Sequence, residues 1–299
     1  MKGRRSTLTM LALAVVVVWT TGYPNAGYAS VRPQRSADSA VALGGQGLDR
    51  GTPGAALGMV GTATEAEWPM AGANLQRTSW TPEEVRGNLK PIWFRPIEPY
   101  ISPKTQIIAA NDRLYIATAR GLYALHTGTG ATGGAGEVAW VYATELPLGH
   151  SPTIHNGVAY VGGLDHKLHA VDALTGSALW TFEAHAGFQT NPLVVGDLVY
   201  AGNRDGRMYA IYAHAHPNRG TLAWSYQTDG PILYSAAYQD NTIYFASNDS
   251  YAYALNAMTG ELVWRSAKLP GSGFHSWWPV VHRDLIVLAG GHSYRVQLE

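Results

Sequence analysis

The sequence predicts an all-β protein built as a β-propeller, and three observations carry this prediction. Charged residues make up only 14% of the 299 residues, whereas Gly (34), Tyr (17) and Trp (10) are abundant, which is typical of short strands joined by tight turns. A segment recurs about every 40 residues, and apolar residues alternate with period two inside each copy. Together these features exclude a helical bundle, a coiled coil and a wholly disordered chain.

The chain ahead of the repeats divides into two parts. A basic start and an apolar run over residues 8–19 lead to small residues before Ser30, which predicts a signal peptide over 1–29 and helix nowhere else. The alternative for this run is an uncleaved membrane anchor. Residues 30–67 hold too few large apolar side chains to order themselves, so we expect a flexible linker. After cleavage no transmembrane span is expected, and the protein is exported, either periplasmic or extracellular.

Residues 68–299 are expected to form the propeller. In the copy that ends at Trp180, a short apolar piece precedes two alternating stretches, and a fourth stretch follows a Thr-Gly turn. Four strands in about 40 residues are typical of a propeller blade. The dipeptides at 205–206 and 248–249, together with Gly176 and Gly260, are expected to supply the positive φ angles of the hairpins.

Each copy ends in a tryptophan, which we interpret as packing between adjacent blades. These structural residues are Trp93, Trp140, Trp180, Trp224 and Trp264.

Several functions are excluded by composition and motif context. Basic and acidic residues number 21 each, so no basic face for nucleic acid is expected. The absence of Cys excludes disulfides, thiolate metal sites and Cys nucleophiles. The glycines of 128–133 are not followed by a helix, and His214 and His216 have no evident carboxylate partner. We therefore predict no catalytic residue and no metal site.

A group of polar and aromatic residues stands just before each innermost strand. A propeller brings these segments from every blade to one mouth of its central channel, which is a usual place for a ligand. The alternative is that they end strands and line a water-filled axis. The candidate ligand-binding residues are Tyr100, Ser102, His150, Ser151, Gln189, Asn191, Tyr234, Ser235, His275 and Trp277.

Two stretches, residues 170–180 and 254–264, share the spacing Ala-x-Asp/Asn-x-x-Thr-Gly-x-x-x-Trp. This pattern closely resembles the pyrroloquinoline-quinone (PQQ)-like repeat of quinoprotein alcohol dehydrogenases and BamB-like outer-membrane assembly factors. The resemblance covers about residues 105–299, and residues 68–78 look like the lead-in segment of BamB-like proteins. It implies a propeller of seven or eight four-stranded blades.

The resemblance implies two classes of function. We predict an exported, non-enzymatic propeller that acts as a binding or scaffold module in the cell envelope, with another envelope protein or an extracellular polymer as its partner. The alternative is a PQQ-dependent dehydrogenase that oxidises alcohols or sugars, or a fragment of one. Those enzymes hold their quinone with a vicinal Cys pair and calcium. This chain has no Cys and no evident acidic cluster, so no cofactor is expected and PQQ with calcium is not supported.

The repeats account for about five blades, and the last copy ends after three strands, the third at 293–298. Two explanations remain open. We favour a truncated piece of a seven- or eight-bladed propeller. Under the alternative, residues 89–94 supply the missing outer strand and close a five-bladed ring, which would hide the sheet edges.

Overall fold

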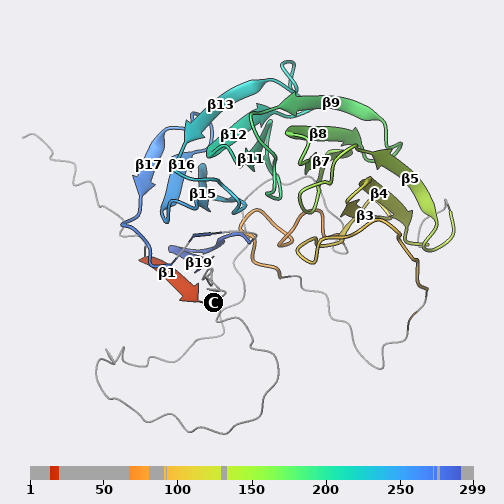
Figure 1. The fold of residues 1–299 in the computed structure, drawn as a ribbon, viewed down its shortest axis with the longest axis horizontal. Coiled ribbons are helices and arrows are strands. Elements are labelled where there is room, and N and C mark those ends of the chain that lie inside the picture. The colour runs from red at the N-terminus through yellow and green to blue at the C-terminus, as the bar shows by residue number, and fades with distance from the viewer. Residues whose placement is uncertain are drawn as a thin grey trace, which may run out of the picture. The chain divides into compact units, whose positions relative to one another are not determined.

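Each repeat folds into an antiparallel sheet, and consecutive sheets follow one another in chain order (Figure 1). The computed structural model describes residues 14–19, 67–80, 91, 93–128, 133–271, 273–274 and 277–290. All of them belong to one compact unit of the chain. The prediction of an all-β propeller with four-stranded blades is confirmed.

Four blades are complete, and in each the strands lie in chain order from the inside outwards. The first blade consists of β2 (Ile108–Ala110), β3 (Arg113–Thr118), β4 (Gly121–His126) and β5 (Val138–Ala143). The second consists of β6 (Thr153–His155), β7 (Val158–Gly162), β8 (Lys167–Asp172) and β9 (Ala178–Glu183). The third consists of β10 (Leu193–Val195), β11 (Leu198–Gly202), β12 (Arg207–Tyr212) and β13 (Leu222–Gln227). The fourth consists of β14 (Ala237–Gln239), β15 (Thr242–Ala246), β16 (Ala252–Asn256) and β17 (Leu262–Arg265).

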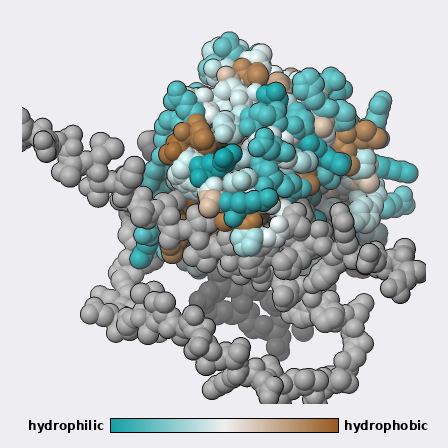
Figure 2. All heavy atoms as spheres, turned by 60° about the vertical axis from the view of Figure 1, so that its left-hand side comes forward, coloured by the Kyte–Doolittle hydropathy of each residue, from teal (hydrophilic) through white to brown (hydrophobic). Residues whose placement is uncertain are grey.

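The apolar core lies between adjacent blades. The second and third strands of a blade are buried along nearly their whole length, because a neighbouring sheet covers each face. Outer strands such as β9 alternate between half-buried and exposed residues. Viewed from the side of β17, the described surface is mostly hydrophilic, with small separate hydrophobic groups (Figure 2).

The recurring tryptophans lie against glycines of the next blade. A Cβ atom on Gly176 would come within 2.6 Å of the Trp140 side chain, and one on Gly260 within 2.6 Å of Trp224. Both glycines have positive φ angles, 75° and 73°, so the turn and the ring contact require the same residue. Gly220 meets Trp180 in the same way, and Gly136 meets Trp93, which precedes the first blade.

One hairpin differs from its expected geometry. The predicted positive φ at 248–249 is wrong, because the left-handed residue is Ser250, with φ 73°. Five residues connect β15 to β16, and Asp249 Oδ1 accepts a hydrogen bond from the Tyr251 backbone N–H at 3.0 Å. The Ser247 N–H donates to the Tyr251 carbonyl just as the Asn203 N–H donates to the Arg207 carbonyl, so Ser250 occupies the position of Gly206 and the prediction placed this turn one residue too early. At 205–206 the expected residue, Gly206, does have a positive φ, 86°.

The fifth blade is built differently from the others. It pairs β18 (Val280–His282) with β19 (Leu285–Gly290) antiparallel, and β1 (Ala14–Trp19) lies parallel to β19. The expectation of helix in the leader is therefore wrong for residues 14–19. Four consecutive β-branched valines favour a strand, which here pairs along an apolar neighbour. The strand predicted at 293–298 lies outside the described residues, and residues 91, 93 and 94 are not in a strand.

Residues 67–80, the axial segment, cross the inner ends of all five blades (orange in Figure 1). Trp68 forms a bridge with Ala109 of the first blade, and the Pro69 carbonyl accepts from Ile154 of the second. The backbone N–H groups of Tyr238 in the fourth blade and Val281 in the fifth donate to the carbonyls of Leu75 and Gln76 respectively.

Arg77 completes these contacts from within the axial segment. Its guanidinium is fully buried and donates to four backbone carbonyls, at 2.5 to 3.2 Å: Ala71, Asn191, Pro192 and Ala236. Burial lowers the pKa of Arg77 to about 9. The axis is therefore occupied by a segment of the chain itself. Among the residues that the structure describes, none forms a helix long and apolar enough to cross a membrane.

Candidate functional site

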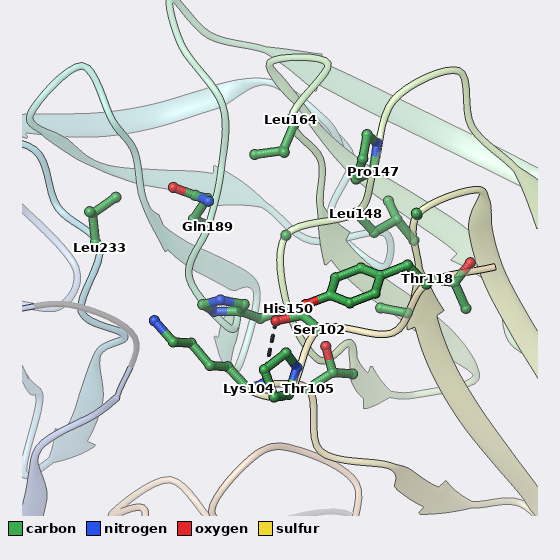
Figure 3. Close-up of a pocket in the computed structure, with 15 residues that line it drawn as sticks. Ser102, Lys104, Thr105, Thr118, Pro147, Leu148, His150, Leu164, Gln189 and Leu233 are labelled. Carbon is green, nitrogen blue, oxygen red and sulfur yellow. Dashed lines mark hydrogen bonds between the residues drawn. The ribbon is translucent and has the colours of Figure 1, made fainter. Parts of the chain in front are cut away.

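A pocket of about 400 Å³ opens at the mouth of the propeller where the innermost strands begin (Figure 3). Loops that lead into the first three blades form most of it, and the fourth blade's loop adds Leu233. The polar lining consists of Tyr100, Ser102, Lys104, Thr105, Thr118, His150 and Gln189. The apolar lining includes Pro103, Pro147, Leu148, Leu164 and Leu233.

The structure separates the predicted ligand-binding residues into groups. Tyr100, Ser102, His150 and Gln189 line the pocket. The other three polar candidates, which are buried beneath it, are Ser151, Asn191 and Ser235.

The remaining candidates lie elsewhere. Tyr234 is buried, donates from its hydroxyl to the Trp278 carbonyl at 2.9 Å and accepts from the Ala289 N–H at 3.1 Å. Burial raises its pKa. Trp277 is 53% exposed and does not line the pocket, whereas His275 lies outside the described residues. Tyr234 therefore joins the fourth blade to the fifth.

The three buried candidates form a polar belt, which we define as Gln106, Ser151, Asn191 and Ser235. Ser151 Oγ accepts from the Gln106 N–H at 2.7 Å, and the Ser151 N–H donates to Asn191 Oδ1 at 2.9 Å. Ser235 Oγ accepts from both the backbone N–H and the side-chain amide of Asn191, at 2.8 and 3.0 Å. Each of these bonds connects one blade to the next, so these polar groups hold the blades together.

His150 lies next to the polar belt in the sequence but has a different environment. Its side chain is 6% exposed, and its Nδ1 atom has no hydrogen-bond partner. Burial, reinforced by the Lys104 ammonium, lowers the pKa of His150 to about 4, so the ring is neutral at neutral pH. Figure 3 shows Lys104 and Ser102 near His150, while Pro147, Leu148 and Leu164 lie on the other side of the pocket.

Sequence reasoning missed two residues that dominate this region. Lys104 directly follows the predicted Tyr100–Pro103 stretch and is the only charged residue lining the described pocket. Arg77 lies inside the lead-in segment, but its acceptors are backbone carbonyls, which no side-chain pattern reveals. Lys104 could have been predicted from the sequence, because it lies directly beside the candidate ligand-binding residues at the mouth.

The aspartates at the equivalent hairpin turns are held inside their own blades. Asp205 accepts from the Tyr209 hydroxyl and Asp249 from the Tyr253 hydroxyl, both at 2.6 Å. Asp165 instead contacts His169 Nε2 at 3.1 Å. In the described part of the chain, no three His, Asp or Glu side chains gather closely enough to hold a metal ion. The His216 ring stacks on Tyr212, with centroids 4.0 Å apart.

Comparison with known proteins gives a consistent family signal. A family model described as "Outer membrane protein assembly factor BamB" matches residues 131–297, more than half of the chain. Tetrathionate hydrolase from Acidithiobacillus ferrooxidans is 28% identical over 138 residues, which covers 38% of this chain and 28% of that protein. The outer membrane protein assembly factor BamB from Nitrosomonas eutropha is 24% identical over 113 residues, which covers 38% of this chain and 26% of that protein.

A solved structure shows the same fold. The quinohemoprotein alcohol dehydrogenase ADHIIG from Pseudomonas putida superposes with a TM-score of 0.54 at 19% identity, covering 70% of this chain and 41% of that one. The chain thus spans less than half the length of each of these three relatives.

Proposed function

The chain belongs to the family of repeat proteins described as outer membrane protein assembly factor BamB, and from this premise we propose that it is an exported, non-catalytic propeller that binds another cell-envelope protein. The partner contact is proposed at the mouth face. Two exposed aromatic side chains are of the kind that anchors protein interfaces: Tyr100 (69% exposed), which lines the pocket, and Trp277 (53% exposed), whose carbonyl accepts from the Ser235 N–H of the polar belt.

The observation that carries this proposal is the use of the axis for structure. The axial segment contacts all five blades. In the polar belt, three of the polar residues that a ligand site in the channel would need are hydrogen-bonded between blades instead. Because the chain itself fills the axis, we infer that a partner binds at an outer face of the propeller. The family match supports an envelope protein as the partner, in preference to an extracellular polymer.

The residues at the mouth do not suit the calcium and quinone that the fold family implies. Calcium takes six to eight oxygen ligands, with carboxylates prominent among them. The described pocket lining contains a lysine, a histidine, hydroxyls and an amide, but no aspartate or glutamate. The sequence also has no Cys that could form a vicinal pair. We therefore derive no redox chemistry at this site.

Site-specific photo-crosslinking in cells tests the proposed contact. A photoreactive phenylalanine analogue replaces Trp277 in one variant and Met258 in the other. Met258 is 64% exposed and lies in the Thr-Gly turn between β16 and β17, at the opposite end of its blade from the mouth. We expect a discrete adduct with one envelope protein from position 277 and none from position 258. Equal adducts from both positions, or none from 277, would contradict the proposal.

The same purified protein tests the alternative of a quinone-dependent dehydrogenase. With added PQQ and calcium, we expect no shifted quinone absorption band and no dye-linked oxidation of alcohols. A stable shifted band together with alcohol-dependent dye reduction would establish the dehydrogenase and overturn the non-catalytic assignment.

A further inference from the structure

We propose that Tyr142, His169 and Asp165 form an acid-sensitive latch between the first and second blades, and that protonation of His169 loosens the turn at residues 163–166 beside the mouth pocket. The three side chains come from β5, from β8 and from the turn between β7 and β8. This inference concerns the fold beside the mouth and does not depend on the proposed partner.

The latch is built around a buried imidazole with both ring nitrogens bonded. His169 is 3% exposed, its Nε2 lies 3.2 and 3.1 Å from the two carboxylate oxygens of Asp165, and its Nδ1 lies 3.1 Å from the Tyr142 hydroxyl. Because an ionised carboxylate only accepts, Nε2 carries the proton of the neutral ring and Nδ1 accepts from Tyr142. A second proton goes to Nδ1 and reverses the hydrogen bond that joins the two blades.

The same position in the next two blade interfaces holds a tyrosine. Tyr209 donates to the Asp205 carboxylate at 2.6 Å, four residues before it in the chain, as in the latch. Tyr253 donates to Asp249 at the same distance and spacing. Each of these tyrosines also contacts an aromatic ring on the outer strand of the preceding blade. Burial, reinforced by the carboxylate, raises the pKa of both phenols, so they stay neutral. Of these three interfaces, the latch alone has at this position a side chain of a type that changes charge between pH 5 and 8.

The surroundings of the ring oppose its protonation. Burial lowers the pKa of His169, Asp165 acts in the opposite direction, and Lys167 lowers the pKa further. Glu183 lies opposite Lys167 in the sheet, and the facing group from the first blade is the neutral phenol of Tyr142, whose pKa is raised by burial. A histidine whose pKa is lowered in the folded state binds its proton more readily when exposed. Acidification below about pH 6.5 therefore favours an open arrangement in which water reaches the ring.

The turn connects the latch to the pocket. A Cβ atom on Gly163 would come within 2.1 Å of Asp165 Oδ1 and 3.0 Å of His169 Nε2, so the turn backbone lies against both groups. Leu164 lines the pocket, and its N–H donates at 2.9 Å to the carbonyl of Pro147, a lining residue that follows the first blade (Figure 3). Movement of the turn away from a protonated ring breaks this bond and changes the pocket wall.

Amide hydrogen exchange of the full chain, followed by NMR, tests the proposal. The Gly163 N–H donates to the carbonyl four residues later, and the N–H groups of Asn203 and Ser247 make the same bond in the third and fourth blades. After correction for intrinsic exchange, we expect protection of Gly163 and Leu164 to fall at least tenfold from pH 7.5 to pH 5.5. Protection of Asn203 and Ser247 should stay within twofold. An equal fall in all three turns, or none at Gly163, would overturn the proposal.

Variants identify the group that responds to pH. His169→Tyr places the residue of the next two blades in the latch, so protection should persist at pH 7.5 and no longer fall at pH 5.5. His166→Gln removes an exposed imidazole from the same turn and should leave the fall unchanged. A fall that persists in His169→Tyr, or that disappears in His166→Gln, would show that His169 does not control the turn.

The unmodified protein decides the matter if His169→Tyr does not fold. The 15N signals of the imidazole ring distinguish its tautomers and its protonated form. We expect His169 to be neutral with its proton on Nε2 at pH 7.5, and to titrate with the same midpoint as the loss of protection at Gly163. A ring that stays neutral while protection falls, or that gains its proton while the turn stays protected, would contradict the latch.

Discussion

His150 and Ser151 are neighbours in the chain, yet they serve the molecule in opposite ways. Ser151 is fully buried, and both its N–H and its hydroxyl bond to adjacent blades. His150 is buried almost as deeply but leaves a ring nitrogen unpaired beside a pocket. The same contrast separates Asn191 from Gln189 in the next blade. The axis side of the mouth therefore stabilises the fold, whereas the pocket side remains available for binding.

The strongest way to break the axis side is to remove Arg77. Arg77→Ala would leave four buried carbonyls without their donor and create a cavity, so we expect a loss of about 4 kcal/mol in unfolding free energy. Urea unfolding followed by tryptophan fluorescence measures this. Arg77→Lys keeps the charge but donates to fewer carbonyls, so its unfolding free energy should lie between those of the wild type and Arg77→Ala. A loss below about 1 kcal/mol would show that the axial segment is not a structural centre.

The tryptophans of the outer strands, Trp180 and Trp264, provide a second comparison. Trp180→Ala should cost about 3 kcal/mol, because its ring lies against Gly220 of the third blade. Trp264 packs against Tyr244 of its own blade and against an apolar cluster that includes Ile286 of the fifth blade, but the glycine contacts described above do not involve it. Trp264→Ala should therefore cost about 1 kcal/mol less. If chemical unfolding showed equal losses of stability for the two variants, the glycine contact would not contribute to the stabilising effect of the tryptophan.

Asn191 and Gln189 test the two sides directly. Asn191→Ala leaves the buried Ser151 N–H without its acceptor, so we expect a loss of about 2 kcal/mol. Gln189→Ala removes a half-buried pocket residue, and its effect should stay within about 0.5 kcal/mol. Thermal and urea unfolding of the pair measure the difference. Similar losses would remove the distinction between belt and pocket.

At neutral pH we expect substitution of His150 to change the unfolding free energy least. Its contribution is expected to appear in the pH dependence of stability. The pKa of His150 is about 4 in the folded protein and near 6.5 when unfolded, so the unfolded chain binds more protons between these values. Stability should therefore fall as pH drops from about 6.5 towards 4, by up to about 1.4 kcal/mol per pH unit for this group.

Burial also lowers the pKa values of His155 and His169, which adds to the same trend. His150→Phe should be nearly neutral at pH 7 and should reduce the acid slope, as measured by urea unfolding across this range. An unchanged slope would show that His150 is already protonated or solvated in the folded protein.

The fold was predictable because its information is local. Alternation within each strand and a turn glycine four residues ahead of Trp140, Trp180, Trp224 and Trp264 define a blade inside about 40 residues. The site was predictable only in part, since the sequence placed Ser151 and His150 at the same mouth without showing which one bonds to the next blade. Arg77 reaches acceptors 114 to 159 residues away, and these are backbone atoms that leave no trace in side-chain pattern. The error at residues 14–19 arose because an apolar run was assigned by its position in the chain although its valines favour a strand.

The axial segment also imposes an order on folding. Each of the four complete blades closes through contacts between strands that are near in sequence, and such local contacts form early. Residues 67–80 precede all four complete blades, yet their partners extend to Val281. During synthesis this segment emerges before those four blades and acquires its last partner only after more than two hundred further residues have been made. Closing such long loops costs entropy before any contact repays it. We therefore expect the blades to form first. The docking of residues 67–80 onto them, which completes the propeller, should be the slowest step.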